Sequence, residues 1–290
     1  MKIAIVTDSN SGMTAQEAQE LGVQIVPMPF SIDGQLYYEG VDLTQEEFFR
    51  RVAQGADVST SQPAPGEVGL LWARLLEEYD QLVYIPMSSG LSNACATARI
   101  LAQEAFPGKA FVVDNKRISV TQWQSVRDAV ALAKRGFDGA QIQQKLEEDA
   151  LNASIYIMVD TLKYLKKGGR ITPAAAAIGA VLNVKPVLQI QGEKLDAFAK
   201  VRGSKAAQQK LIDALRHDLD TRFAGKKMMV AVAYSGSPEA GEAWRQQVQE
   251  AFPQYEVFSA PLTLSVACHT GPGALGVGCI QLLDLPENAQ

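Results

Sequence analysis

The sequence is poor in the two residue types that enzymes and metal sites use most often, cysteine and histidine. Only 3 of the 290 residues are cysteines and only 2 are histidines. A small, odd number of cysteines provides no disulfide framework and favours a reducing compartment, so we expect a cytoplasmic protein. The two histidines do not form the paired motif of a zinc enzyme, so we expect no metal site.

Long apolar segments and an excess of basic charge are also absent. The N-terminal apolar run, residues 3–6, stops at Thr7 and is too short for the core of a signal peptide. The longest weakly polar segment, residues 173–184, is too short to cross a bilayer and ends at Lys185. With 32 acidic and 27 basic residues the net charge is −5, which argues against a nucleic-acid partner. We expect no membrane-spanning segment.

The motifs of several enzyme classes are missing as well. The chain has no P-loop and no G-x-S-x-G nucleophile elbow. GPGALG at residues 271–276 matches G-x-G-x-x-G, but the residues after it read as a strand, so no dinucleotide site is expected. Cys268 stands beside His269 without a third group to orient the pair, which argues against cysteine catalysis. We therefore expect no cofactor and no catalytic residue, so that the chain by itself would not catalyse a reaction.

Strand and helix patterns alternate in the first half of the chain. We predict strands at residues 2–6, 23–30, 81–87 and 109–114. Thr14 and Thr44 are each followed three residues later by glutamate, the capping-box pattern of a helix start. A third helix is expected after Pro65, where apolar residues recur at helical spacing. This alternation indicates an α/β sheet with helices on both faces.

The second half of the chain is richer in strands. We predict them at residues 154–159, 185–191, 194–201, 227–235, 255–260 and 275–283. The two strands on either side of Gly192 read as a hairpin. We therefore predict an α/β protein of two domains. Residues 1–152 would form an N-terminal α/β/α layer with a mostly parallel sheet, and residues 153–290 a C-terminal domain with a mixed sheet.

Two loops rich in hydroxyl groups are candidates for binding an anion. Thr60 and Ser61, in VSTSQPAPGEV, precede a helix start, where free N–H groups and the helix dipole attract negative charge. Ser89 and Ser92, in PMSSGLSNACATA, follow a strand, and ligands bind α/β sheets outside the carboxyl ends of their strands. Helix capping remains the alternative for each loop. Two such loops at equivalent positions would converge on one small anion.

One histidine and two arginines complete the set of candidates. His269 is predicted to lie in a glycine-rich turn within VACHTGPGALGVGC, and it is a better candidate for a ligand contact than His217, which reads as a surface residue. Arg170 and Arg202 each lie beside a glycine in a predicted loop. They are either solvated surface residues or contacts to a phosphate or an acidic partner.

Together, the motifs STSQP, SSGLS, DTLKYLKKGGRI, LNVKP and HTGPGALGVG resemble those of the DegV-like fatty-acid-binding proteins. The similarity extends over nearly the whole chain. It implies two α/β domains with one long-chain fatty acid between them. Some members act as the FakB subunit of bacterial fatty acid kinase, which presents the acyl carboxylate to a separate kinase subunit. The acyl-phosphate that results feeds phospholipid synthesis.

The resemblance also implies roles for particular residues. The groups that would surround the carboxylate are Thr60, Ser61, Ser89, Ser92, His269, Thr270 and Gly271. Arg170 and Arg202 would face the phosphate or the kinase. The chain departs from the family pattern at Asn93 and Ala94, at Gln122 and Trp123, and in GRITPAAAA, and these departures bear on chain-length preference and kinase docking. A lipid carrier or sensor without a kinase partner, and a small-molecule transferase or hydrolase, remain alternatives.

Overall fold

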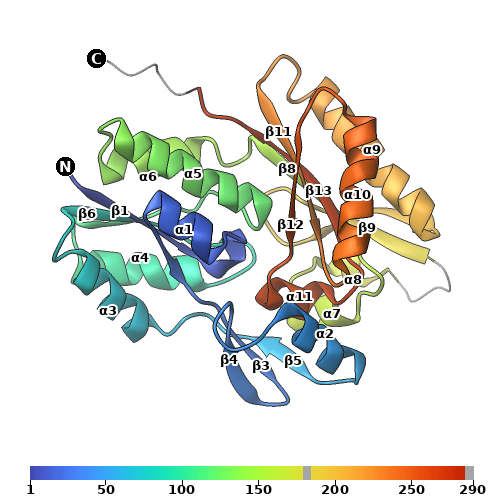
Figure 1. Cartoon of the computed structure of the whole chain (residues 1–290), viewed down its shortest axis with the longest axis horizontal. Helices are drawn as coiled ribbons and strands as arrows, with labels where there is room; N and C mark the ends of the chain where they lie inside the picture. Colours follow the sequence, from blue (N-terminus) through green and yellow to red (C-terminus); the bar gives the residue numbers. More distant parts are fainter. Residues whose placement is uncertain (179–183, 285–290) are drawn as a thin grey trace. The chain divides into compact units, whose positions relative to one another are not determined.

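The computed structural model describes residues 1–178 and 184–284, which divide into two compact units (Figure 1). The first unit comprises Met1–Pro29 and Ser61–Leu151, together with Leu283 and Asp284. The second comprises Phe30–Thr60 and Asn152–Leu282. The sequence prediction assigned all of residues 1–152 to one domain, whereas the structure groups residues 30–60 with the second unit. The cause is a shared core in which Phe30 and Phe48 pack with Leu264 and Cys268.

The first unit is built on a parallel sheet with strand order β2-β1-β6-β7. Its strands are β1 (Ile3–Asp8), β2 (Val23–Val26), β6 (Gln81–Ile85) and β7 (Ala110–Val112). Its helices are η1 (Ser9–Ser11), α1 (Ala15–Leu21), α3 (Pro65–Leu75), α4 (Ala94–Ala105), α5 (Val120–Lys134) and α6 (Gly139–Glu148). Helices α3 and α4 cover one face, where Trp72 and Tyr84 are buried, and α5 and α6 cover the other. The predicted parallel α/β layer is confirmed.

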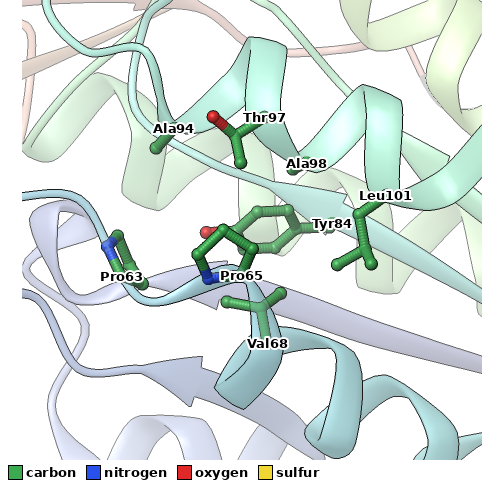
Figure 2. A pocket seen from close by; sticks show the side chains of 8 residues that line it. All are labelled: Pro63, Pro65, Val68, Tyr84, Ala94, Thr97, Ala98 and Leu101. Atoms are coloured by element: carbon green, nitrogen blue, oxygen red, sulfur yellow. The ribbon is translucent and has the colours of Figure 1, made fainter.

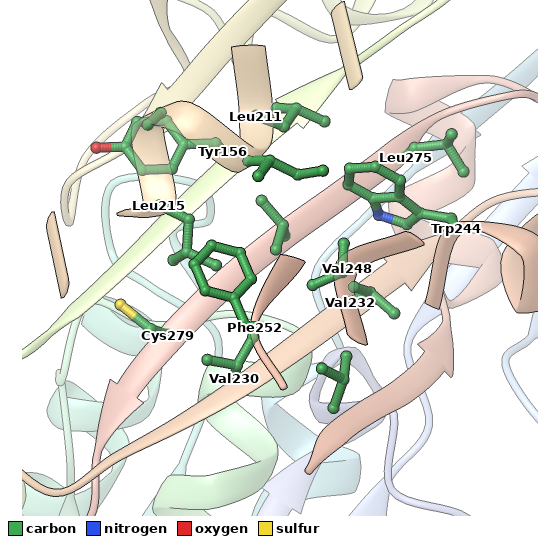
Figure 3. Packing of buried hydrophobic residues seen from close by; sticks show 14 of the residues in the cluster. Tyr156, Leu211, Leu215, Val230, Val232, Trp244, Val248, Phe252, Leu275 and Cys279 are labelled. Atoms are coloured by element: carbon green, nitrogen blue, oxygen red, sulfur yellow. The ribbon is translucent and has the colours of Figure 1, made fainter. Parts of the chain in front are cut away.

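The second unit contains a mixed sheet with strand order β10-β9-β8-β13-β11-β12. The strands are β8 (Ala153–Met158), β9 (Val184–Ile190), β10 (Asp196–Arg202), β11 (Met228–Tyr234), β12 (Val257–Pro261) and β13 (Leu275–Gln281). All neighbours are antiparallel except β11 and β12. Helices α9 (Ser204–Asp220) and α10 (Pro238–Ala251) bury Leu215, Trp244 and Val248 against this sheet (Figure 3). The mixed sheet and the hairpin around Gly192 are confirmed.

A small antiparallel sheet, with order β4-β3-β5, completes the second unit. Its strands are β3 (Pro29–Ile32), β4 (Gln35–Tyr38) and β5 (Val58–Thr60), and the remaining helices are α2 (Gln45–Ala53), α7 (Lys163–Gly168), α8 (Pro173–Ala176) and α11 (Leu264–Thr270). The prediction of a glycine-rich turn around His269 is wrong for the histidine itself, which lies in the last turn of α11. The signal that was missed is Thr263 ahead of the helix and Gly271, with φ 72°, at its end.

The two predicted helix starts differ. Thr14 and Glu17 form the full capping box, because each side chain accepts a hydrogen bond from the other residue's backbone N–H. Thr44 caps α2 in the same way, but the carboxylate of Glu47 turns instead to Arg50 and Arg51, each 2.7–2.8 Å away. The second box is therefore only half formed, since arginine offers a charged partner.

Among the residues that the structure describes, no helix is both long and apolar enough to cross a membrane. Leu182 and Asn183 of the LNVKP motif, and part of the weakly polar segment at residues 173–184, lie outside the described residues.

Candidate functional site

The side chain of His269 is clamped between two other segments of the second unit. Its Nε2 lies 2.8 Å from the Oγ1 of Thr60, at the end of β5. On the other side of the ring is Gly168, the last residue of α7. A Cβ at this glycine would lie 2.0 Å from Nδ1 of the histidine. Only glycine at position 168 lets the ring lie where it does.

The ring is held in its neutral form. Burial, followed by the positive charge of Arg170, lowers the pKa of His269 to about 4. The guanidinium of Arg170 donates to the carbonyl of Gly168, on the same segment that contacts the ring. Nδ1 is buried and has no hydrogen-bond partner among the described residues. A neutral imidazole, a hydroxyl and a nearby guanidinium form a set of groups that suits an anion.

The glycines after His269 serve packing. A Cβ at Gly271 would lie 2.5 Å from the ring of Tyr164, and a Cβ at Gly273 would lie 2.4 Å from the carboxylate of Asp160. Both glycines have positive φ. Glycine is therefore needed at positions 271 and 273 because the backbone there passes close to Tyr164 of α7 and to Asp160 in the turn after β8.

Two of the predicted ligand contacts are engaged in the end of α11. The hydroxyl of Thr270 points to the carbonyls of Val266 and Gly271, at 3.4 and 3.3 Å. The carbonyl of Gly271 also accepts a 2.5 Å hydrogen bond from Ser235. These contacts fix the helix end on which His269 lies.

In the first unit, Ser61 is exposed and its hydroxyl has no hydrogen-bond partner among the described residues. Helix α3 begins only at Pro65, and its N-cap Ala64 makes no side-chain cap bond. The capping alternative for Thr60 and Ser61 is therefore wrong. Gln62, next to Ser61, accepts a 3.2 Å hydrogen bond from Thr97 of α4, so this loop lies against the helix that follows Ser92.

Ser89 belongs to a charged group that sequence reasoning missed. Its hydroxyl is 2.6 Å from Nζ of Lys116, and its backbone N–H donates to Asp114 at 3.2 Å. Lys116 pairs with Asp114 at 3.1 Å and has φ 60°, which lysine rarely adopts. Burial would raise the pKa of Asp114, but the hydrogen bonds from Ser89 and the charge of Lys116 lower it. Asn93 is the N-cap of α4 and makes no side-chain cap bond, but Ser92, one residue earlier, accepts from the N–H of Ala94, the first residue of the helix. The hydroxyl of Ser92 therefore still serves the helix start.

The first unit contains a narrow apolar pocket (Figure 2). Its lining side chains lie around the ring of Tyr84 and come from the loop before α3, from α3, from β6 and from α4: Pro63, Pro65, Val68, Tyr84, Ala94, Thr97, Ala98 and Leu101. Pro63 follows Ser61 by two residues, and Ala94 follows Ser92 by two residues. The space holds roughly one water molecule. Apart from Tyr84 and Thr97, every lining residue is fully apolar.

Gln122 and Trp123, where the chain departs from the family pattern, do not line this pocket. The Nε2 of Gln122 lies 3.0–3.2 Å from Thr7, Asp8 and the carbonyl of Ile85. Trp123 donates to Glu17. Burial raises the pKa of Asp8 to about 6, despite hydrogen bonds from Met87, Gln122 and Asn10. These residues form a buried polar network within the first unit.

The remaining candidates differ in their surroundings. Arg202 ends β10, is exposed, and makes no side-chain hydrogen bond or ion pair within the described part of the chain. Burial raises the pKa of Cys268 to about 12, so its thiolate is scarce at neutral pH. Among the described residues, no three or more histidine, cysteine or acidic side chains lie where they could hold a metal ion.

Comparison with protein families gives one match that spans almost the whole chain. Residues 2–282 match the family model described as "Uncharacterised protein, DegV family". A DegV domain-containing protein of Deinococcus radiodurans is 36% identical over 278 residues, which cover 96% of this chain and 98% of that protein.

Solved structures show the same similarity. A structure described as fatty acid binding of a DegV family protein from Thermus thermophilus aligns with a TM-score of 0.88 at 33% identity, and covers 97% of this chain and all of that one. DegV of Bacillus subtilis, described as a fatty acid binding protein, aligns with a TM-score of 0.85 at 27% identity over 97% of this chain and 99% of that one. A stearic acid-binding protein of Eubacterium ventriosum aligns with a TM-score of 0.87 at 25% identity over 97% and 98%.

Proposed function

The chain belongs to the DegV family, and on that basis we propose that it binds one long-chain fatty acid. The observation that carries the proposal is the narrow apolar pocket of the first unit, whose lining includes Pro63, two residues after Ser61, and Ala94, two residues after Ser92. An acyl chain needs an apolar cavity, and its carboxylate needs donors at the mouth of that cavity. Ser61 and Ser92 are those donors in the proposal, and relatives from Thermus thermophilus and Bacillus subtilis are described as fatty acid binding.

The tail supplies the affinity. About fourteen methylenes at roughly 0.8 kcal/mol each contribute about 11 kcal/mol before the costs of ordering. Because the pocket is narrow, an acyl chain must displace side chains of the lining, and Leu101, which has two rotatable side-chain bonds, can turn aside more readily than the β-branched Val68. Small residues at Ala94 and Ala98 leave the backbone of α4 close to the path.

The head group is held by hydroxyls and a neutral ring. Thr60 directly precedes Ser61 in the chain and is hydrogen-bonded to His269, so we assign both to the carboxylate as well. Lys116 adds a positive charge beside Ser89. A carboxylate held by hydroxyl groups keeps more of its nucleophilicity than one in a bidentate arginine clamp. Thr270 and Gly271 act in this proposal by fixing the histidine.

A weakly held carboxylate suits a protein that presents its ligand to a second protein for reaction. We therefore propose that the chain presents the acyl carboxylate to a separate kinase subunit in the cytoplasm, with Arg170 and Arg202 at the phosphate or the kinase surface. Arg202 is exposed, which favours a contact with the phosphate or the kinase over a contact with the bound acyl chain. A carrier or sensor without a kinase is the second candidate, and it shares the same binding site.

A pocket-filling variant tests the binding proposal. Ala98 is 4% exposed and faces the pocket, so Ala98→Leu should obstruct it, whereas Ala96 on the same helix is exposed. Fatty acids of eight to eighteen carbons would be titrated into the wild type, Ala98→Leu and the control Ala96→Leu. We expect Ala98→Leu to weaken binding of the longest chains most and the control to bind normally. Equal binding by all three proteins would exclude this pocket.

A further inference from the structure

Helix α11, which carries His269, is capped by a residue from a distant part of the chain. Thr263 occupies the N-cap position but makes no side-chain cap bond. Instead the carboxylate of Glu39 accepts from the N–H of Leu264 at 2.9 Å and from the N–H of Ser265 at 2.8 Å. Gln45 donates to the carbonyl of Leu262 at 2.9 Å, just ahead of the helix.

The other end of the helix is held by the same small sheet. Thr60, at the end of β5, contacts the ring of His269. β5 pairs with β3, where Phe30 lies opposite Thr60, and β3 is hydrogen-bonded to β4, which leads into Glu39. Leu264 and Cys268 pack into the core of this sheet. The segment Phe30–Thr60 therefore contacts α11 at its first turn, through Glu39, and at its last turn, through Thr60.

We propose that Glu39 is a positioning residue for His269, which fixes α11 so that the ring meets Thr60. The proposal rests on the proposed function only in taking the ring as a contact of the ligand's carboxylate. A helix of seven residues has too few internal hydrogen bonds to hold its own position. The carboxylate of Glu39 supplies the missing attachment, because it accepts two N–H hydrogen bonds at the positive end of the helix dipole.

The surroundings of Glu39 make this contact specific. Burial raises the pKa of Glu39, and the two N–H groups and the hydroxyl of Ser265 act in the opposite direction. Because the carboxylate of Glu39 is shielded from water, the N–H groups of Leu264 and Ser265 take the place of water as its hydrogen-bond donors. This keeps the carboxylate at the start of α11. Glutamine at this position keeps the length but has one acceptor oxygen in place of two and no charge.

The experiment compares Glu39→Gln with Glu46→Gln, a control with the same charge change at an exposed position of α2. The chain has only two histidines, so nuclear magnetic resonance of the ring nitrogens resolves each one. His217, exposed on α9, serves as the internal reference. In Glu39→Gln we expect the His269 signals to move and to titrate at a higher pH than in the wild type. The control and His217 should stay unchanged.

A purely structural cap gives a different result. If Glu39→Gln lowers the melting temperature but leaves the His269 ring signals and their titration as in the wild type, the positioning role is overturned. Glu39→Asp keeps the charge and both acceptors, so its ring signals should lie nearer to the wild type than those of Glu39→Gln. Should Glu39→Gln not fold, Gln45→Ala loosens the same helix end and must shift the His269 signals in the same direction.

Titration of palmitate into the same variants separates this proposal from the proposed function. We expect Glu39→Gln to lose up to roughly tenfold in affinity, the worth of a hydrogen bond to a charged group. A shifted ring with unchanged affinity supports the positioning role and removes His269 from the binding site. If the wild type does not bind palmitate, the binding proposal fails, and the ring signals still decide the role of Glu39.

Discussion

The polar groups of the two units are held in place in different ways. In the first unit, Ser89 accepts from Lys116, in the loop after β7, and Ser92 accepts from Ala94, the first residue of α4. In the second unit, His269 depends on contacts with Thr60 and Gly168, and on a helix capped by Glu39, all remote in sequence. Loops at the end of a sheet follow from the fold, whereas the position of His269 requires several segments to assemble first.

The two units also differ in the buried groups that titrate. In the first unit, burial raises the pKa of Asp8 and of Asp128 to about 6. In the second, burial lowers the pKa of His269 to about 4. Both shifts favour the neutral form, but they have opposite consequences for stability as the pH changes.

The largest expected effect is the pH dependence that His269 confers. The folded-state pKa of about 4 lies below the usual value of 6.5, so the stabilisation is present above pH 6.5 and is lost as the pH falls towards 4. At 1.36 kcal/mol per pKa unit, the loss is about 3 kcal/mol. Denaturant unfolding of the wild type and His269→Gln at pH 4.5 and 7 measures it. If the two proteins lose the same stability on acidification, the ring is not held neutral.

In the first unit, Asp8 should make the stability change with pH in the direction opposite to that caused by His269. Its folded-state pKa of about 6 exceeds the usual 3.8, so the contribution to stability is present below pH 3.8 and is lost as the pH rises through 6. The change is again up to about 3 kcal/mol. Between pH 4 and 6.5 the stability of Asp8→Asn should therefore rise relative to that of the wild type, whatever the other groups contribute. A stability difference between the two proteins that stays constant over this range would show that Asp8 does not titrate in it.

A pair of glycines compares the packing of the two units. Gly168→Ala should cost about 1–3 kcal/mol of unfolding free energy, because its Cβ would overlap His269. Gly66, in the first turn of α3, has open space where a Cβ would lie, so Gly66→Ala should be neutral or stabilise by about 0.5–1 kcal/mol. Chemical denaturation of both variants measures the contrast. Equal effects would mean that the ring moves aside freely.

The hydroxyls of the first unit should contribute less. Ser92→Ala removes a proposed donor to the carboxylate, and the loss should be about tenfold in affinity for a long-chain fatty acid. Fluorescence or calorimetric titration measures this loss of affinity. The control is Ala96→Ser, which adds a hydroxyl at an exposed position of α4. Unchanged affinity in both Ser92→Ala and Ser61→Ala would leave Ser92 as a helix cap only.

The smallest expected effect on binding is that of Arg202→Ala. The tail supplies most of the affinity in our account, so this variant should bind fatty acid as the wild type does. Acyl-phosphate formation with a cognate kinase subunit should fall sharply, because a contact made only after binding is removed. Binding and turnover would be measured on the same preparation. A parallel loss of both would place Arg202 in the binding site.

The sequence predicted most of what local patterns determine. The parallel sheet, the mixed sheet, the Thr14 capping box and the Gly192 hairpin all follow from periodicity and turn chemistry within short windows. The grouping of residues 30–60 with the second unit did not follow, because it depends on Phe30 and Phe48 packing against α11. Glu39 was missed for the same reason, since its partners lie 225 and 226 residues away.

The candidate site was predictable to a similar extent. Hydroxyl-rich loops after strands are visible in the sequence, and Ser89 and Ser92 lie where the pattern places them, at the carboxyl end of β6. Lys116 gave no such signal, because a lysine in a loop is ordinary until its φ of 60° and its contact with Ser89 are known. Thr270 and Gly271 were singled out by resemblance, and their contacts show that they fix the end of α11.

Mass spectrometry of the purified protein tests the central claim most directly. Native spectra give the mass of the complex, and denaturing extraction identifies what is released. We expect one long-chain fatty acid per chain, either retained through purification or taken up when fatty acids are added. A protein that carries no fatty acid and takes up none at any chain length would contradict the account.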